Sequence, residues 1–115
     1  MLEPRLKPGI WVKAQVRLCD RAGIALTVLR RGDADGGSVI LKLIGAGGRA
    51  DLLIQATGPR GDLAWMRPLG PDPVEEAEAD AYIARQGAFD PDIWVLEVID
   101  RRGAYRIDGA VIEGY

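Results

Sequence analysis

The chain has 115 residues and a mass of 12.4 kDa, which is enough for one domain with a packed core. Hydrophobic residues make up 48% and charged residues 28%, so the composition excludes wholesale disorder and fibrous repeats. No apolar run approaches the roughly 20 residues that cross a bilayer, and the first residues lack the apolar stretch of a secretion signal. We therefore expect a single domain over residues 1–115, located in the cytoplasm and without membrane contact.

The side-chain inventory excludes several classes of enzyme. There is no histidine, and Cys19 is the only cysteine. Without histidine, no Ser-His or Cys-His pair can activate a nucleophile, which excludes triad hydrolases and Cys-His proteases. A structural zinc site needs about four Cys or His ligands, far more than this chain offers. We expect no cofactor and no structural metal, although carboxylate, lysine, tyrosine or magnesium chemistry stays open.

Charge is distributed unevenly along the chain, although the net value is only −2. Residues 1–31 carry seven Lys or Arg against two acids, and residues 72–100 carry nine acids against one Arg. The basic end could contact phosphate or an acidic partner. Two structural interpretations compete with that one: in the first the basic and acidic segments lie near each other, and in the second each faces solvent.

A first helix is predicted over residues 8–22, because proline suits the first turn and Gly23 suits the position after the last turn. Its apolar residues cover one side, while Lys13 and Arg17 lie on the other. Gln15 falls within the apolar side, where an unpaired amide would be costly, so we expect it to reach a backbone partner.

Four strand-like runs follow, separated by glycine-rich segments. Short connections favour antiparallel neighbours, because parallel strands need crossovers of about a dozen residues. The polar segment 32–37 is expected to form a hairpin loop between the first two strands. The pattern therefore predicts a four-stranded antiparallel meander, with strands over residues 24–30, 39–44, 50–56 and 62–67.

A second helix is predicted after the meander. Asp72, Pro73 and Glu75 form a capping-box pattern, and Gly87 provides a stop. Beyond it, a turn over residues 100–103 is expected to join two strands in a C-terminal β-hairpin, with strands over residues 93–99 and 104–108. The predicted fold is α+β, with a helix, the meander, a second helix and the hairpin, and with both helices on one face of the sheet.

One glycine motif carries a functional alternative. Residues 45–50 satisfy the G-x-G-x-x-A form of a dinucleotide-binding pattern. That function needs a helix to open at the glycines, whereas an apolar strand-like run follows them. A tight turn between strands is therefore favoured over a nucleotide site.

Six polar residues remain as candidate binding residues. Arg30 and Arg31 end a predicted strand beside a glycine-rich loop that contains Asp33 and Asp35. Such a loop could bind an anion or hold a metal, although solvated turns look similar. The other two candidates are Lys13 and Arg17 on the basic side of the first helix.

Three hypotheses of function follow. The leading one is a small non-enzymatic module that binds a protein partner through the basic side of the first helix (Lys13, Arg17 and Arg21) and the loop from Arg30 to Asp35. The second is nucleic-acid binding through the basic helix, although a pI of about 5.1 and the lack of a known motif oppose it. The third is a divalent-metal-dependent enzyme that uses Asp33 and Asp35. An exposed edge strand could also mediate a homodimer.

Four segments of the chain have a distinctive wording: LKPGIWVKA at 6–14, VLRRGDADGG at 28–37, EAEADAYIARQ at 76–86 and FDPDIWVLEV at 89–98. Together they resemble a small alphaproteobacterial family, the domain of unknown function numbered fourteen ninety-one. The resemblance extends from about Arg5 to Asp108. It implies a cytoplasmic, single-domain bacterial protein and supplies no activity, cofactor or catalytic residue.

Overall fold

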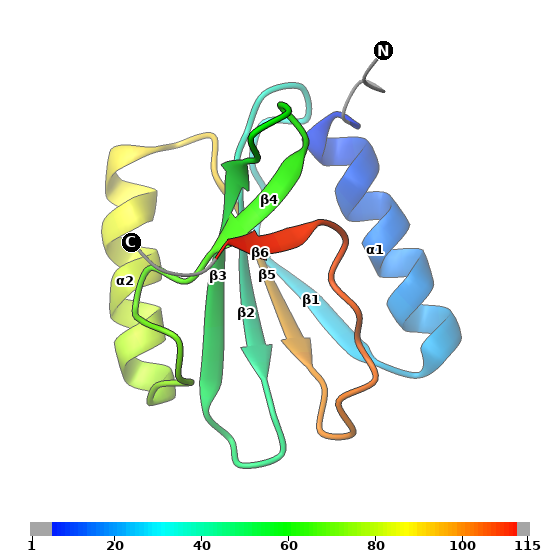
Figure 1. Cartoon of the computed structure of the whole chain (residues 1–115), viewed down its shortest axis with the longest axis vertical. Coiled ribbons are helices and arrows are strands. Elements are labelled where there is room, and N and C mark those ends of the chain that lie inside the picture. Colours follow the sequence, from blue (N-terminus) through cyan, green and yellow to red (C-terminus); the bar gives the residue numbers. More distant parts are fainter. Residues whose placement is uncertain (1–5, 113–115) are drawn as a thin grey trace.

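The computed structural model describes residues 6–112, which form a six-stranded mixed β-sheet with one helix on each face (Figure 1). The fold is α+β, as predicted. The helices are α1 (Pro8–Ala22) and α2 (Glu76–Phe89). The strands are β1 (Ala25–Arg30), β2 (Val39–Ile44), β3 (Ala50–Thr57), β4 (Leu63–Met66), β5 (Trp94–Ile99) and β6 (Ala110–Ile112).

The strand order is β1-β5-β2-β3-β4-β6, which corrects the predicted four-stranded antiparallel meander. β5 lies between β1 and β2, pairing antiparallel with β1 and parallel with β2. The residues of β5 are mostly buried, whereas those of β1 are mostly exposed. β5, which is more apolar than β1, therefore takes the interior position between β1 and β2 and prevents these two strands from forming a hairpin. Only β2, β3 and β4 form an antiparallel meander.

The predicted C-terminal hairpin is also wrong. β6 pairs in parallel with β4 at the far edge of the sheet, and residues 104–108 are not a strand. Side chains explain where this segment goes. The hydroxyl of Tyr105 donates to Gln15 Oε1 at 2.7 Å, and Asp108 accepts bonds from the indoles of Trp11 and Trp65. The segment is thus drawn onto the α1 face, and Gln15 is paired with a side chain instead of the expected backbone group.

The two helices cover opposite faces of the sheet, which corrects the expectation that they share one face. Along β2, Val39 and Leu41 pack with Trp11 of α1, whereas Ile40 packs with Ala79 of α2. Because side chains alternate between faces along a strand, a central strand that is apolar at nearly every position needs cover on both sides.

Helix α1 has the predicted bounds, and Gly23 after it adopts the left-handed conformation with φ 71°. Helix α2 begins later than the capping-box pattern predicts, at Glu76, and continues past Gly87. The backbone N–H and C=O of Val74 both pair with Ala50 of β3 at 2.8 Å, which holds the chain extended there. In the described residues, neither helix combines the length and apolarity required to span a membrane.

Candidate functional site: a basic groove beside the edge strand

A groove of about 630 Å³ lies between α1, β1 and the loop that follows β1. We call it the α1/β1 groove. Its apolar lining includes Ile10 and Val16, which are 54% and 40% exposed, whereas Trp11, Val12 and Cys19 of the same helix are buried. Val28 of the edge strand and the ring of Trp94 continue this lining from the sheet. The groove therefore offers apolar surface to a binding partner.

Basic side chains surround this apolar surface. Lys7, Lys13, Arg17 and Arg31 line the groove with a single carboxylate, Asp35, so the charges sum to +3. Lys7 Nζ lies 3.3 Å from Asp35 Oδ1, and both side chains are exposed. Within residues 6–112, Lys13 and Arg17 form no ion pair. The groove thus combines an apolar floor with an excess of positive charge.

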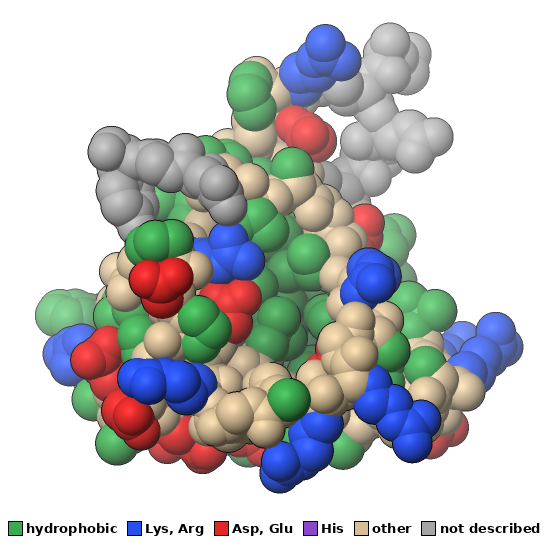
Figure 2. All heavy atoms as spheres, turned by 60° about the horizontal axis from the view of Figure 1, so that its bottom comes forward, with side chains coloured by type: hydrophobic (Ala, Val, Ile, Leu, Met, Phe, Trp, Pro, Cys, Tyr) green, Lys and Arg blue, Asp and Glu red, His purple; other side chains and the backbone are tan. Residues whose placement is uncertain are grey.

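Charge also separates across the molecule. In Figure 2, acidic side chains gather on the side where α2 lies in Figure 1, whereas basic side chains lie on both sides and predominate on the side of α1. The uneven charge along the sequence therefore becomes a polarity in space, because the basic and acidic helices lie on opposite faces of the sheet. An acidic partner approaching the α1 side would be attracted by this field.

The structure brings together four of the six predicted binding residues. Lys13, Arg17, Arg31 and Asp35 all line the α1/β1 groove. The other two do not. The guanidinium of Arg30 donates to the carbonyl of Pro91 at 3.4 Å.

Asp33 has a role in shaping the loop. Its carboxylate accepts the backbone N–H groups of Asp35 and Gly36 at 3.2 and 2.8 Å, which forms a turn. Its backbone N–H donates to the carbonyl of Asp92 at 2.9 Å, and its carbonyl accepts the indole N–H of Trp94 at 2.8 Å. The loop that carries Arg31 and Asp35 is therefore anchored to the chain around the start of β5.

A close approach of two backbone segments also fixes this loop. A Cβ on Gly37 would collide with the carbonyl oxygen of Asp92, so glycine is required there. The stacking of Arg31 over Trp94, 5.9 Å from the ring centroid, adds a cation–π contact at the groove wall. Arg31 and the loop that carries it are consequently held in place before any partner binds.

The arrangement gives the metal-enzyme hypothesis no support. Asp33 uses its carboxylate to accept two amide N–H groups, and Asp35 is paired with Lys7. Across residues 6–112, no group of three or more Asp, Glu, Cys or His side chains is arranged to hold a metal ion. The glycine-rich segment after β2 forms the turn of the β2–β3 hairpin, with no helix at its glycines, so the tight-turn interpretation is confirmed.

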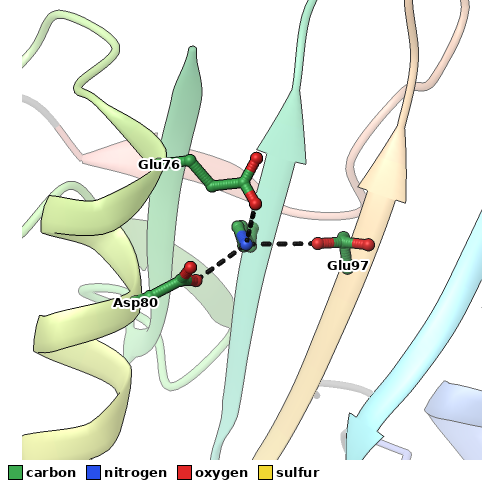
Figure 3. A network of polar contacts seen from close by, with 4 residues as sticks. Glu76, Asp80 and Glu97 are labelled. Carbon is green, nitrogen blue, oxygen red and sulfur yellow. Dashed lines mark hydrogen bonds and ion pairs between the residues drawn. The ribbon is translucent and has the colours of Figure 1, made fainter. Parts of the chain in front are cut away.

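A second polar cluster surrounds Lys42 in the centre of the sheet. Figure 3 shows Glu76 and Asp80 reaching from α2, and Glu97 from β5, towards one lysine nitrogen. Lys42 Nζ lies 2.7 Å from Asp80, 3.0 Å from Glu76 and 3.1 Å from Glu97. Lys42 is only 2% exposed, so this ammonium group is enclosed by its partners.

The protonation of Lys42 follows from these contacts. Burial lowers the pKa of Lys42, but hydrogen bonds to Asp80, Glu76 and Glu97 outweigh it and raise the pKa above the ordinary lysine value. The lysine therefore stays charged and ties α2 to the sheet. We interpret the cluster as structural, because all three carboxylates are engaged by one cation.

Sequence reasoning missed both the apolar lining of the groove and the Lys42 cluster. A usable signal existed for the second: Lys42 interrupts an apolar strand, and a lysine at such a position needs an acidic partner. The acid-rich second helix is the natural source of one. For the groove, no local signal separates Ile10 or Val16 from residues that a helix buries.

The fold defines a small α+β protein with a mixed sheet between two helices. Its candidate site is the α1/β1 groove, which has an apolar lining and a basic rim. The sequence matches the family described as protein of unknown function (DUF1491) over residues 6–108. The chain belongs to this family, as its sequence motifs suggested, and the function of the family is unknown. No curated protein matches the sequence.

Solved structures of the same family have the same fold. A crystal structure of a DUF1491 family protein from Caulobacter crescentus CB15 has 38% identity and a TM-score of 0.82, covering 94% of this chain and 100% of that chain. An NMR structure of a DUF1491 family protein from the same organism has 37% identity and a TM-score of 0.83, covering 96% and 100%. The solution structure of protein Atu0922 from A. tumefaciens has 26% identity and a TM-score of 0.72, covering 90% of each chain.

Proposed function

We propose that this protein is a non-enzymatic interaction module that binds an acidic protein segment in the α1/β1 groove. The observation that carries the proposal is the combination of exposed apolar lining with a charge of +3 at one groove. An acidic segment with apolar side chains would satisfy both features, because its carboxylates meet the basic rim while its apolar groups leave water. The free thiol of Cys19 is compatible with a cytoplasmic location.

Nucleic-acid binding is the second candidate, since Lys13, Arg17 and Arg31 could contact phosphates. Two features rank it lower. The groove lining contains one aromatic residue, Trp94, which is only 5% exposed and leaves little surface for stacking bases. The chain as a whole is acidic, with a net charge of −2. Nucleic acid therefore serves as a competing outcome of the test.

The proposal is tested with a fluorescent peptide of about eight residues that alternates Glu and Val, roughly the length of one strand. Fluorescence anisotropy should show that it binds the wild-type protein. The double variant Lys13→Glu/Arg17→Glu should bind at least about tenfold more weakly, because two attractive charges become repulsive. A peptide that alternates Lys and Val should not bind.

The matched control is Arg21→Glu, which reverses a charge in the last turn of α1, outside the groove lining. It should leave the affinity nearly unchanged. Failure of the wild-type protein to bind the acidic peptide, or an equal loss in the control variant, would overturn the proposal. Tighter binding of a single-stranded oligonucleotide, with an affinity that falls steeply with salt, would favour the nucleic-acid function instead.

A further inference from the structure

We infer that the acidic segment binds in extended form, as an additional strand along the free edge of β1. This inference rests on the proposed function and specifies the geometry of the bound partner. Among residues 6–112, β1 is the terminal strand of the sheet and pairs only with β5. Five of its six residues are exposed, so the edge is accessible from solvent. An exposed edge of this kind can pair with another strand.

The register identifies which backbone groups face outward. The N–H groups of Trp94 and Asp100 donate to carbonyl oxygens on the β2 side, at 2.8 and 2.9 Å. Because backbone groups alternate in direction along a strand, Glu97 points its N–H and C=O towards β1, where Thr27 is its partner. The neighbours of Thr27, which are Leu26 and Val28, therefore point their N–H and C=O groups to the free edge.

The same two residues connect the free edge to the groove. Val28 lines the groove, and Leu26 packs against the core on the α1 side of the sheet. A strand added beside β1 would place alternate side chains on this side, where they would meet Ile10 and Val16 of α1. Edge pairing and groove occupancy are therefore two parts of one binding mode.

The register also limits the length of the added strand. A bulge between Val28 and Arg30 interrupts the ladder at the end of β1. Bulges of this type twist an edge and terminate pairing. The added strand therefore pairs with residues 25–28, and its next residues lie against the loop that contains Arg31.

Charge decides which occupant fits. A second copy joined through β1 would bring the strand ALTVLR, which contains Arg30 and no carboxylate, to a groove that already carries a charge of +3. The positive charges of the two copies would then repel one another. A segment with Glu or Asp among β-branched residues avoids this repulsion, so we assign the edge to an acidic partner and not to a second copy.

Amide hydrogen exchange followed by NMR tests this geometry with the same Glu/Val peptide. In the free protein, the amide protons of Leu26 and Val28 should exchange quickly. Addition of the peptide should protect both of them, while the amide of Thr27, which already pairs with β5, should change little. Protection of Leu26 and Val28 would support strand addition, whereas fast exchange at both in the saturated complex would overturn it.

A proline substitution gives an independent readout. Val28→Pro removes an N–H that points outward, which an edge strand tolerates, and the peptide should bind about tenfold more weakly. Thr27→Val changes a residue of the same strand whose backbone groups pair with β5 and whose side chain is outside the groove lining, so it should bind like the wild-type protein. Circular dichroism checks that both variants fold.

The two proposals fail in different ways. Peptide binding that depends on Lys13 and Arg17 but shows no protection at Leu26 and Val28, and no loss in Val28→Pro, would overturn strand addition and leave groove binding intact. Absence of peptide binding would overturn both. A protein that sedimentation shows to be dimeric, with Leu26 and Val28 already protected without peptide, would assign the edge to a second copy.

Discussion

The indole N–H of Trp94 donates to the backbone carbonyl of Asp33 at 2.8 Å, which links a buried side chain of β5 to the loop beside the groove. The strand that the sequence pattern assigned to a terminal hairpin is thus the one that supports the candidate site. Arg31 stacks on the same indole ring. Because the loop is held before binding, a partner does not have to order it, and the entropy cost of association is smaller.

Gly37→Ala should destabilise the protein, because the new Cβ collides with the carbonyl of Asp92 and the backbone must move. We expect a loss of about 1–3 kcal/mol in urea-induced unfolding, together with weaker peptide binding. The control is Gly47→Ala, where an added Cβ meets no atom within 4 Å. Equal stabilities of these two variants would show that the loop has no close contact with residue 92.

Lys42→Met should destabilise the protein by about 2–4 kcal/mol, because it leaves Glu97 with a partly buried and unpaired charge. Hydration of Glu76 and Asp80, whose side chains are about half exposed, should limit the loss of stability. Urea denaturation measures the effect. The control variant Glu78→Gln, on α2 but outside the cluster, should unfold like the wild-type protein. A Lys42→Met variant of unchanged stability would contradict the role of the cluster in holding α2.

The stabilisation that Lys42 provides should decrease at alkaline pH. Burial lowers its pKa, but the three carboxylates raise it more, so the folded protein holds this proton more tightly than the unfolded chain does. The contribution is therefore complete below the unfolded lysine pKa of about 10.4 and declines as the pH rises above it. The stability difference between wild type and Lys42→Met should be constant from neutral pH up to that pH and shrink beyond it. A difference that grows with pH would contradict this sign.

Tyr105→Phe should cost about 1–3 kcal/mol, because it removes the hydrogen bond to the buried amide oxygen of Gln15. Thermal unfolding measures the loss. The control is Tyr82→Phe, because Tyr82 lies in α2 and its hydroxyl takes no part in the hydrogen bonds between residues 104–108 and α1. Similar melting temperatures for Tyr105→Phe and wild type would contradict the assigned role of this bond.

Tyrosine titration offers a second test of the same contact. Burial, assisted by the charges of Cys19 and Asp108, raises the pKa of Tyr105 above the ordinary tyrosine value. In the wild-type protein, part of the tyrosinate absorbance should therefore appear only when alkali unfolds the chain. In Tyr105→Phe that delayed fraction should decrease. A wild-type titration without any delayed fraction would contradict the burial of this hydroxyl.

The candidate site was predictable in its charges and not in its shape. Lys13 and Arg17 follow from the polar side of a helix, and Arg31 and Asp35 from a loop beside a strand. Their convergence on one groove depends on how α1 lies against β1, which residues distant in sequence decide. The sequence predicts a binding role for Asp33, because a loop carboxylate can bind a cation or a hydrogen-bond donor. In the structure, this carboxylate instead accepts two backbone N–H groups of its own turn.

Family membership, the bounds of α1 and the position of β2 were determined by the sequence alone, because they depend on local signals such as proline, glycine and apolar runs. The insertion of β5 between β1 and β2, the opposite placement of the helices and the late start of α2 were decided only by the tertiary structure. The physical reason is that strand pairing and burial minimise the free energy of the whole sheet. Short connections bring two strands close, but β5, which is apolar on both faces, takes an interior position between β1 and β2, where both of its faces leave water.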